Sequence, residues 1–396
     1  MNPRTSIVAL AAACLLARGA FAQTPATASN PVGVWRGTSL CRVRPSPCND
    51  EIVVYRITRV NASDSLSIDA RKIVKGQEEE MGVLGCRVDA SGAHLTCRIP
   101  NGVWRFTVRG DSLVGELRSP DNRKYRDVNA ARVAVETKST PSADGTPISY
   151  AVTGHGDPAM VFVHGWAGDQ SYWRDQVSYF APTHLVITLD LAGHGSSGRG
   201  RSDWSIQRFG EDVAAVVRAT GATKVVLIGH SLGGPVVVEA ALQLPDQTMG
   251  VVGVDTFFDA WSTPSFANRV AGMRADFIGA TTGFVRRTMF NAQSDTALAS
   301  RVTSAMAKIP PEVGIPAIAS LGPWASTRSA NAFAALRVPL GTIQRSAAGH
   351  TELERARPTL TRLDANVMAG PGHFLMLEDP VRFNVTLDSL VRRLLK

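Results

Sequence analysis

Beyond its first 22 positions the sequence lacks long apolar runs, and charged residues make up only 19% of its 396 residues. A helix that crosses a membrane needs about 20 consecutive apolar residues, so no transmembrane segment is expected. Lysine and arginine exceed aspartate and glutamate by only eight and are scattered, which argues against a nucleic-acid-binding face. The 44% of hydrophobic residues suffice for a large core. At roughly 150 residues per domain, the length favours two domains.

The first 22 residues have the pattern of a secretion signal. Arg4 gives a positive start, Ile7–Ala17 is a short apolar stretch, and Ala20 and Ala22 form an Ala-x-Ala cleavage site. The sequence therefore predicts a signal peptide at 1–22 and an exported protein, either periplasmic or secreted. Because this segment carries two arginines and no acidic residue, its removal lowers the net charge from +8 to +6.

Cysteine is scarce, and after the predicted signal it is confined to one region. The four positions are Cys41, Cys48, Cys86 and Cys97. In an exported protein an even number implies disulfides, and pairing the first with the second and the third with the fourth closes two short loops. Two other connectivities stay open. A zinc site is the rival, but no two cysteines are separated by two residues and only His94 lies nearby.

Residues 31–135 are expected to form a small antiparallel sheet or barrel that the disulfides staple. Alternating runs such as Glu51–Thr58 and Val103–Val108 are separated by turns rich in Asn, Asp, Ser and Gly. No catalytic group assembles in this module, so a stabilising or docking role is favoured over a second active site, with a surface polymer as one ligand it could bind. Residues 136–145, rich in Ser, Thr, Pro and Gly, are predicted to be a linker.

The pattern changes at residue 146, and the chain from 146 to 396 is predicted to be an α/β domain. Apolar runs of about five residues alternate with helical stretches, which is typical of a mostly parallel sheet flanked by helices. Strands are expected at 148–152, 160–163, 185–189, 224–228, 251–254, 339–343 and 366–369. Helices are expected at 206–220, 232–244 and 380–395.

A strand, a sharp turn and a helix meet around Ser231. The apolar strand Val225–Ile228 runs into the sequence G-H-S-L-G, and the apolar stretch Val236–Leu242 follows. Glycines two residues before and after the serine allow a turn that presents its hydroxyl at the sheet edge and frees the next N–H to stabilise an oxyanion. The context predicts Ser231 as a nucleophile. His230 is expected to point away from it and to be structural.

Three further motifs lie at strand ends of the same region. They are His164–Trp166, Asp190–Gly198 with the sequence D-L-A-G-H-G-S-S-G, and Gly370–Phe374, which is followed by L-E-D-P at 377–380. Together with the serine turn, they make residues 146–396 resemble the α/β-hydrolase superfamily.

The resemblance implies a role for each motif. His373 would be the general base that takes the proton of Ser231. The main-chain N–H groups of Trp166 and Leu232 would form the oxyanion hole, with His164 shaping that loop. The Asp190–Gly198 turn would be a packing element.

The acid of the predicted triad departs from the usual pattern. Many members of the superfamily carry it after the strand before the one that leads to the histidine, but here the strand 339–343 is followed by Q-R-S. Some relatives carry the acid one strand earlier, where this sequence has Asp255. Asp255 is therefore the predicted acid that orients His373. Asp259 and Glu352 are the alternatives.

A long insertion, about 256–336, separates two of the predicted strands and far exceeds the 2 to 6 residues of an ordinary connection. It is predicted to be a helical lid. Its large apolar residues imply a substrate with an apolar acyl or alcohol part, although most of them would form the lid's own core. They are Phe257, Phe258, Trp261, Phe266, Met273, Phe277, Phe284, Met289, Phe290 and Trp324.

The sequence thus predicts an exported serine hydrolase that cleaves a small carboxylic ester through an acyl-enzyme, with Ser231, His373 and Asp255 as its triad. Neither a metal nor a cofactor is expected. The alternatives keep the triad for a thioester, lactone, amide or carbon–carbon bond, since a fold does not fix a substrate. A haloperoxidase-like side reaction without a cofactor is another alternative, and a catalytically silent binding protein is the last.

Overall fold

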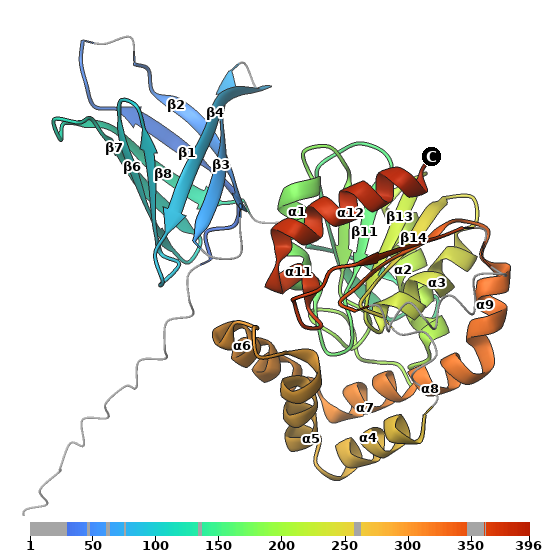
Figure 1. Cartoon of the computed structure of the whole chain (residues 1–396). Helices are drawn as coiled ribbons and strands as arrows, with labels where there is room; N and C mark the ends of the chain where they lie inside the picture. The colour runs from blue at the N-terminus through green and yellow to red at the C-terminus, as the bar shows by residue number, and fades with distance from the viewer. Residues whose placement is uncertain are drawn as a thin grey trace, which may run out of the picture.

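The computed structural model describes residues 30–45, 48–60, 64–74, 77–133, 137–256, 263–346, 360 and 362–396. The predicted signal peptide and the alternative acids Asp259 and Glu352 lie outside these residues. The chain forms a small strand-rich domain and a larger domain with helices around a sheet (Figure 1). Within the described ranges, no helix combines the length and the apolar character needed to cross a membrane.

The N-terminal domain is a closed antiparallel barrel in the described residues. Neighbouring strands pair in chain order, and the last strand pairs with the first. They are β1 (Gly33–Cys41), β2 (Glu51–Arg59), β3 (Ser65–Val74), β4 (Gln77–Val88), β5 (His94–Ile99), β6 (Gly102–Arg109), β7 (Ser112–Arg118) and β8 (Lys124–Arg132). Because alternate side chains point inward, large residues such as Trp35, Tyr55 and Phe106 fill the interior.

Both disulfides pair as the sequence predicts. The bond between Cys86 and Cys97 joins directly paired positions of β4 and β5. The bond between Cys41 and Cys48 spans seven residues after the end of β1. Each bond therefore closes a short loop within the barrel.

The C-terminal domain is built on one sheet, in which the described strands have the order β16-β15-β14-β13-β11-β12-β10-β9. These strands are β9 (Thr137–Pro141), β10 (Pro147–Thr153), β11 (Ala159–Val163), β12 (Val186–Leu189), β13 (Val225–His230), β14 (Thr248–Val254), β15 (Leu340–Gln344) and β16 (Leu363–Val367). The strands from β11 to β16 are parallel, and the hairpin of β9 and β10 is antiparallel. Every residue of β11, β12 and β13 is buried, as expected where helices cover both faces.

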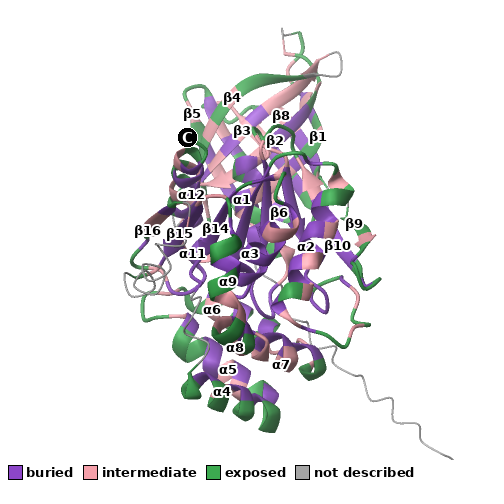
Figure 2. Ribbon diagram, turned by 90° about the vertical axis from the view of Figure 1, so that its right-hand side faces the viewer, coloured by how far each residue is buried: buried purple, intermediate pink, exposed green. Residues whose placement is uncertain are grey.

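The helices around the sheet follow the predicted pattern. They include η1 (Gln170–Trp173), α1 (Arg174–Phe180), α2 (Ile206–Thr220), α3 (Gly233–Gln243), α11 (Leu375–Glu378) and α12 (Pro380–Leu394). The α2 helix begins where Ser205 accepts the N–H of Arg208 and ends at Gly221, whose φ of 72° is left-handed. Buried residues gather in the sheet and in the barrel interior (Figure 2). The expected fold class, an α/β domain with a separate all-β domain, is confirmed.

The prediction that 136–145 form a linker is wrong for most of this range. Thr137–Pro141 forms β9, which pairs along β10 at the edge of the sheet. Four of its five side chains are exposed and the fifth is half-buried, so the strand shows no apolar alternation. Main-chain hydrogen bonds hold it in place instead. The last strand also differs from its prediction at 366–369, because β16 covers Leu363–Val367 and is only partly buried.

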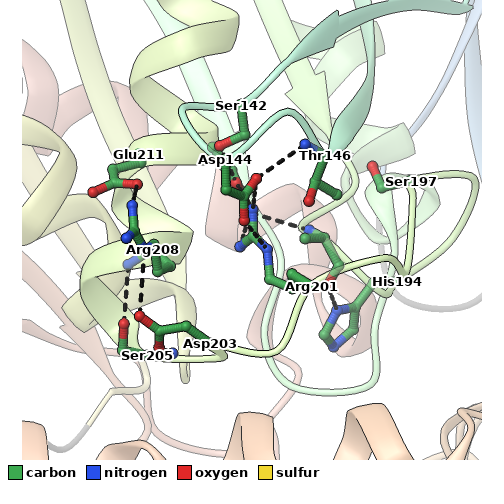
Figure 3. Close-up of polar contacts among 12 residues, drawn as sticks. Ser142, Asp144, Thr146, His194, Ser197, Arg201, Asp203, Ser205, Arg208 and Glu211 are labelled. Atoms are coloured by element: carbon green, nitrogen blue, oxygen red, sulfur yellow. Dashed lines mark hydrogen bonds and ion pairs between the residues drawn. The ribbon is translucent and has the colours of Figure 1, made fainter.

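A buried ion pair fixes the turn between β9 and β10. The guanidinium of Arg201 lies 2.9 Å from Asp144 of the turn (Figure 3). It also lies 2.6 Å from Asp212 of α2. The hydroxyl of Ser142 donates to Asp212 at 2.6 Å. Because the side chains of Arg201 and Asp212 are almost completely buried, each needs the other's charge. The hairpin is therefore an integral part of the C-terminal domain.

Between β14 and β15 the described residues from 263 onward form a helical insertion, which Figure 1 shows gathered at one end of the sheet. Its elements are α4 (Pro264–Ala275), α5 (Phe277–Phe284), η3 (Val285–Met289), α6 (Thr296–Met306), α7 (Pro311–Ala319), α8 (Leu321–Pro323), η4 (Trp324–Arg328) and α9 (Ser329–Ala335). Phe257, Phe258 and Trp261 lie outside the described residues. Buried side chains of the insertion include Phe266, Met273, Phe277, Phe284, Met289 and Trp324.

Candidate active site

Ser231 lies at the sharp turn between β13 and α3. Its φ of 53° falls in the left-handed region, which non-glycine residues seldom adopt. The turn can be this tight because Gly229 has no Cβ, which would collide with the carbonyl oxygen of Gly233. The N–H of Ser231 donates to the carbonyl of Val254 at 2.9 Å, so the turn is tied to the end of β14. The residue itself is 6% exposed.

Asp255 follows β14, and the structure brings it to His373. Nδ1 of His373 and Oδ2 of Asp255 are 2.7 Å apart. Because a carboxylate only accepts hydrogen bonds, the imidazole proton lies on Nδ1, and Nε2 keeps a lone pair. Asp255 is fully buried and His373 is 5% exposed. Of the three acids named from the sequence, Asp255 is the one that lies within the described ranges.

His230 connects the serine turn to the loop at 368–374, which carries His373 and is called the histidine loop below. It directly precedes Ser231, and its ring centroid lies 4.5 Å from that of His373. Its Nε2 donates to the carbonyl oxygen of His373 at 3.0 Å. Burial, followed by the neighbouring His373 ring, lowers the pKa of His230 well below its ordinary value, so this ring stays neutral. These contacts are those of a residue that supports the loop.

The segment His164–Trp166 approaches Ser231 closely. A Cβ at Gly165 would lie 3.0 Å from the Cβ of Ser231, so this approach favours glycine. Nδ1 of His164 donates to the carbonyl of Gly165 at 2.7 Å, and its Nε2 accepts the N–H of Leu191 at 3.0 Å. His164 thereby fixes the course of the loop.

The main-chain N–H groups of Trp166 and Leu232 lie at this approach. One follows Gly165 and the other follows Ser231 in the chain. Neither N–H has a hydrogen-bond acceptor in the part of the chain that the structure describes. Both remain able to donate to a third group.

Arg345 is a site residue that the sequence analysis did not single out. Its main-chain N–H donates to Oδ1 of Asp255 at 3.0 Å, and its Nε lies 3.4 Å from Oδ2. The signal in the sequence is its position, because Arg345 directly follows β15, the strand after which many members of the superfamily carry the acid.

Glu378 is a second residue to which the sequence assigned no role. Its carboxylate accepts the N–H of Gly372 at 3.0 Å and that of Phe374 at 3.3 Å, on either side of His373. It also accepts the hydroxyl of Ser294 from the helical insertion at 2.6 Å. One carboxylate therefore holds the histidine loop to the insertion.

The insertion contacts the site directly as well. The main-chain N–H of His373 donates to the carbonyl of Met289, the last residue of η3, at 2.6 Å. The indole N–H of Trp166 donates to the carbonyl of Gly314 in α7 at 2.7 Å. Displacing these helices would disturb two loops that meet at Ser231.

The chemistry available here is that of acid, base and hydroxyl groups. Among the described residues, no three His, Cys, Asp or Glu side chains are grouped so that they could hold a metal ion. A serine on a strained turn, a buried His–Asp pair and two donor N–H groups are the elements that covalent catalysis at a carbonyl requires.

Comparisons with known proteins agree with this architecture. Residues 158–290 match the family model described as alpha/beta hydrolase fold. The dihydrolipoyllysine-residue acetyltransferase component of the acetoin cleaving system of Cupriavidus necator is 26% identical over 187 residues, which are 47% of this chain and 50% of that protein. The 3-oxoadipate enol-lactonase 2 of Acinetobacter baylyi is 29% identical over 120 residues, 30% of this chain and 45% of that protein. The chain spans half or less of the length of these relatives.

A solved structure extends the likeness over a larger share of the chain. A thermophilic esterase from Thermogutta terrifontis superposes with a TM-score of 0.58 at 20% identity, covering 66% of this chain and 100% of that one. The C-terminal region has the α/β-hydrolase fold.

Proposed function

We propose that the C-terminal domain, which has the α/β-hydrolase fold, is a serine hydrolase that cleaves carboxylic esters through an acyl-enzyme. The observation that carries the proposal is the 2.7 Å hydrogen bond between His373 and Asp255 beside the strained turn of Ser231. A carboxylate that keeps the proton on Nδ1 leaves Nε2 free to take the proton of a serine hydroxyl.

The reaction follows from these positions. Oγ of Ser231 attacks the ester carbonyl carbon while its proton passes to Nε2 of His373. The N–H groups of Trp166 and Leu232 donate to the oxyanion that forms. When the tetrahedral intermediate collapses, the alcohol leaves with the proton from His373. Water then attacks the acyl-enzyme, passing a proton to Nε2 of His373. The carboxylic acid leaves, and Ser231 regains its proton from His373.

The helical insertion is proposed to act as a lid. Ser231 and His373 are almost fully buried beneath the contacts that the insertion makes with Trp166 and the histidine loop. Buried aromatic residues of the insertion, such as Phe277 and Phe284, favour an ester with an apolar acyl or alcohol part. One relative is named an enol-lactonase. Lactones, which are internal esters, are therefore the second substrate class to examine.

The proposed site of action is outside the cytoplasm. Two disulfides within the barrel are consistent with an oxidising compartment, and the first 22 residues have the sequence of an export signal. The barrel carries none of the proposed catalytic residues, so its role in this proposal is stabilisation or docking.

The test is covalent labelling of the purified full-length protein with a fluorophosphonate probe, followed by peptide mass analysis. Labelling at Ser231 that disappears in His373→Ala is expected. Ser196→Ala removes an exposed serine of the same domain and serves as the matched control, which should label like the wild type. A folded wild-type protein without any label would favour a silent binding protein instead.

A further inference from the structure

Arg345 stands directly after β15, at the place where many α/β-hydrolases carry the acid of the triad. We propose that Arg345 is a positioning residue, which holds Asp255 against His373 and links this pair to the helical insertion. This inference rests on the proposed function and names a further part of the same site.

Both oxygens of the Asp255 carboxylate are engaged. The main-chain N–H of Arg345 donates to Oδ1 at 3.0 Å, while Oδ2 accepts Nδ1 of His373 at 2.7 Å and lies 3.4 Å from the guanidinium Nε. The Asp255 side chain is fully buried, whereas that of Arg345 is 29% exposed. A buried carboxylate needs a nearby positive charge and hydrogen-bond donors, and Arg345 supplies both from one residue.

The same guanidinium reaches the insertion. Its Nη1 donates to the carbonyl of Thr288 at 3.0 Å. Thr288 and Met289 end η3, and the last carbonyls of a helix have no partner within the helix. The Met289 carbonyl accepts the N–H of His373 at 2.6 Å. Neighbouring carbonyls of one helix end thus contact both partners of Asp255, so a shift of η3 would loosen the acid and the base together.

Among the residues that the structure describes, the ionisable groups near His373 include Asp255, His230, Glu378 and Arg345. Oδ2 of Asp255 lies 2.7 Å from Nδ1 of His373, and His230 is kept neutral by burial, which lowers the pKa of His230. The Glu378 carboxylate accepts the N–H groups on either side of His373.

Arg345 brings a positive charge to the pair of Asp255 and His373. Two more cations, Arg286 and Arg287, lie on η3 with exposed side chains, where solvent screens their charge. A nearby positive charge disfavours the protonated form of an imidazole, so loss of the Arg345 charge should raise the pH below which labelling of Ser231 slows.

The experiment measures the second-order rate constant for labelling of Ser231 by the fluorophosphonate probe between pH 5 and 9, in the full-length protein. The midpoint is the pH on the acid side at which this rate constant is half of its maximum. Arg345→Gln is expected to raise the midpoint by about one pH unit. Labelling below the midpoint then becomes about tenfold slower. Arg345→Lys keeps the charge and should hold the midpoint near that of the wild type.

Arg382→Gln is the matched control. Arg382 is an exposed arginine that also donates to a main-chain carbonyl of the histidine loop, that of Ala369 at 2.8 Å, but no contact joins it to Asp255 in the described residues. Its loss should leave the midpoint unchanged. If Arg345→Gln does not fold, Arg345→Met keeps much of the aliphatic stem and gives the same comparison.

The outcomes separate the two proposals. A labelled wild type with the same midpoint in Arg345→Gln, even if labelling is uniformly slower, assigns Arg345 a purely structural role and overturns this inference alone. The inference is supported if the midpoint moves upward in Arg345→Gln and stays at the wild-type value in Arg345→Lys. A folded wild type that is not labelled overturns the proposed function, and this inference with it.

Discussion

Replacing Asp255 by asparagine should disable the site by moving the proton of His373 to the wrong nitrogen. The N–H of Arg345, 3.0 Å from Oδ1, needs an oxygen acceptor, so the amide oxygen of asparagine takes that position. The amide NH₂ then replaces Oδ2 and faces Nδ1, which is 2.7 Å from it in the wild type. Because NH₂ only donates, Nδ1 must become the acceptor and Nε2 must carry the proton. No lone pair remains for the serine proton.

The expected loss follows from this tautomer. In the trypsin-like triad the equivalent change lowers kcat by about 10⁴. That factor corresponds to about 5.5 kcal/mol of transition-state stabilisation. The side chain keeps its shape and its bond to the Arg345 N–H, so the variant should fold like the wild type. Ester turnover, not stability, should therefore change.

The assay is kcat/KM for a short chromogenic ester, with thermal unfolding as the check on folding. Asp379→Asn is the matched control. Asp379 lies six residues after His373 in the chain, and its side chain caps α12, where it accepts the N–H of Arg382 at 3.2 Å. Its turnover should stay within a few-fold of the wild type. A fall of less than tenfold in folded Asp255→Asn would refute the tautomer argument and move the acid elsewhere.

Two further predictions concern stability and the domain boundary. Burial lowers the pKa of His194 from 6.5 to about 3, so the unfolded chain binds a proton before the native one as the pH falls. The free energy of unfolding in urea should therefore drop by about 2 kcal/mol between pH 7.5 and 5 through this residue alone. His194→Asn should show a shallower pH dependence, and equal slopes would contradict the assignment. A protein that starts at residue 137 keeps β9 and should retain ester turnover, whereas one that starts at 145 loses Ser142 and Asp144. The shorter protein should be less stable by about 2 kcal/mol, because hydrogen bonds to the buried charges of Arg201 and Asp212 are lost. Equal melting temperatures of the two would count against β9 as part of the domain.

The serine turn and the long helices could be predicted because their signals are local. Glycines at fixed offsets from Ser231 allow only one kind of turn, and α2 has an apolar face, a serine cap and a terminal glycine within its own sequence. The predicted range 206–220 is the observed one. Asp255 is predicted differently, from the resemblance to relatives that carry the acid one strand earlier, and its contact with His373 spans 118 residues of chain.

Other parts of the site depend on contacts that no local pattern reveals. Arg345 matters through its main-chain N–H and the end of η3, and neither has a sequence signature. The β9 strand is held by backbone pairing while its side chains face solvent, so its composition is that of a loop. The last strand, β16, lies at the opposite edge, where the polar Asp364 near its start shifted the predicted range toward the more apolar residues that follow Asn366.

The pairing of β9 limits how far apart the two domains can lie along the chain. The barrel ends at Arg132 and the sheet begins at Thr137. Five steps of 3.8 Å between consecutive Cα atoms allow a separation of about 19 Å at most between these residues. Short tethers of this kind create effective concentrations in the millimolar range. A polymer held by the barrel would therefore present its bonds to the hydrolase domain at such a concentration, however dilute it is in the surroundings.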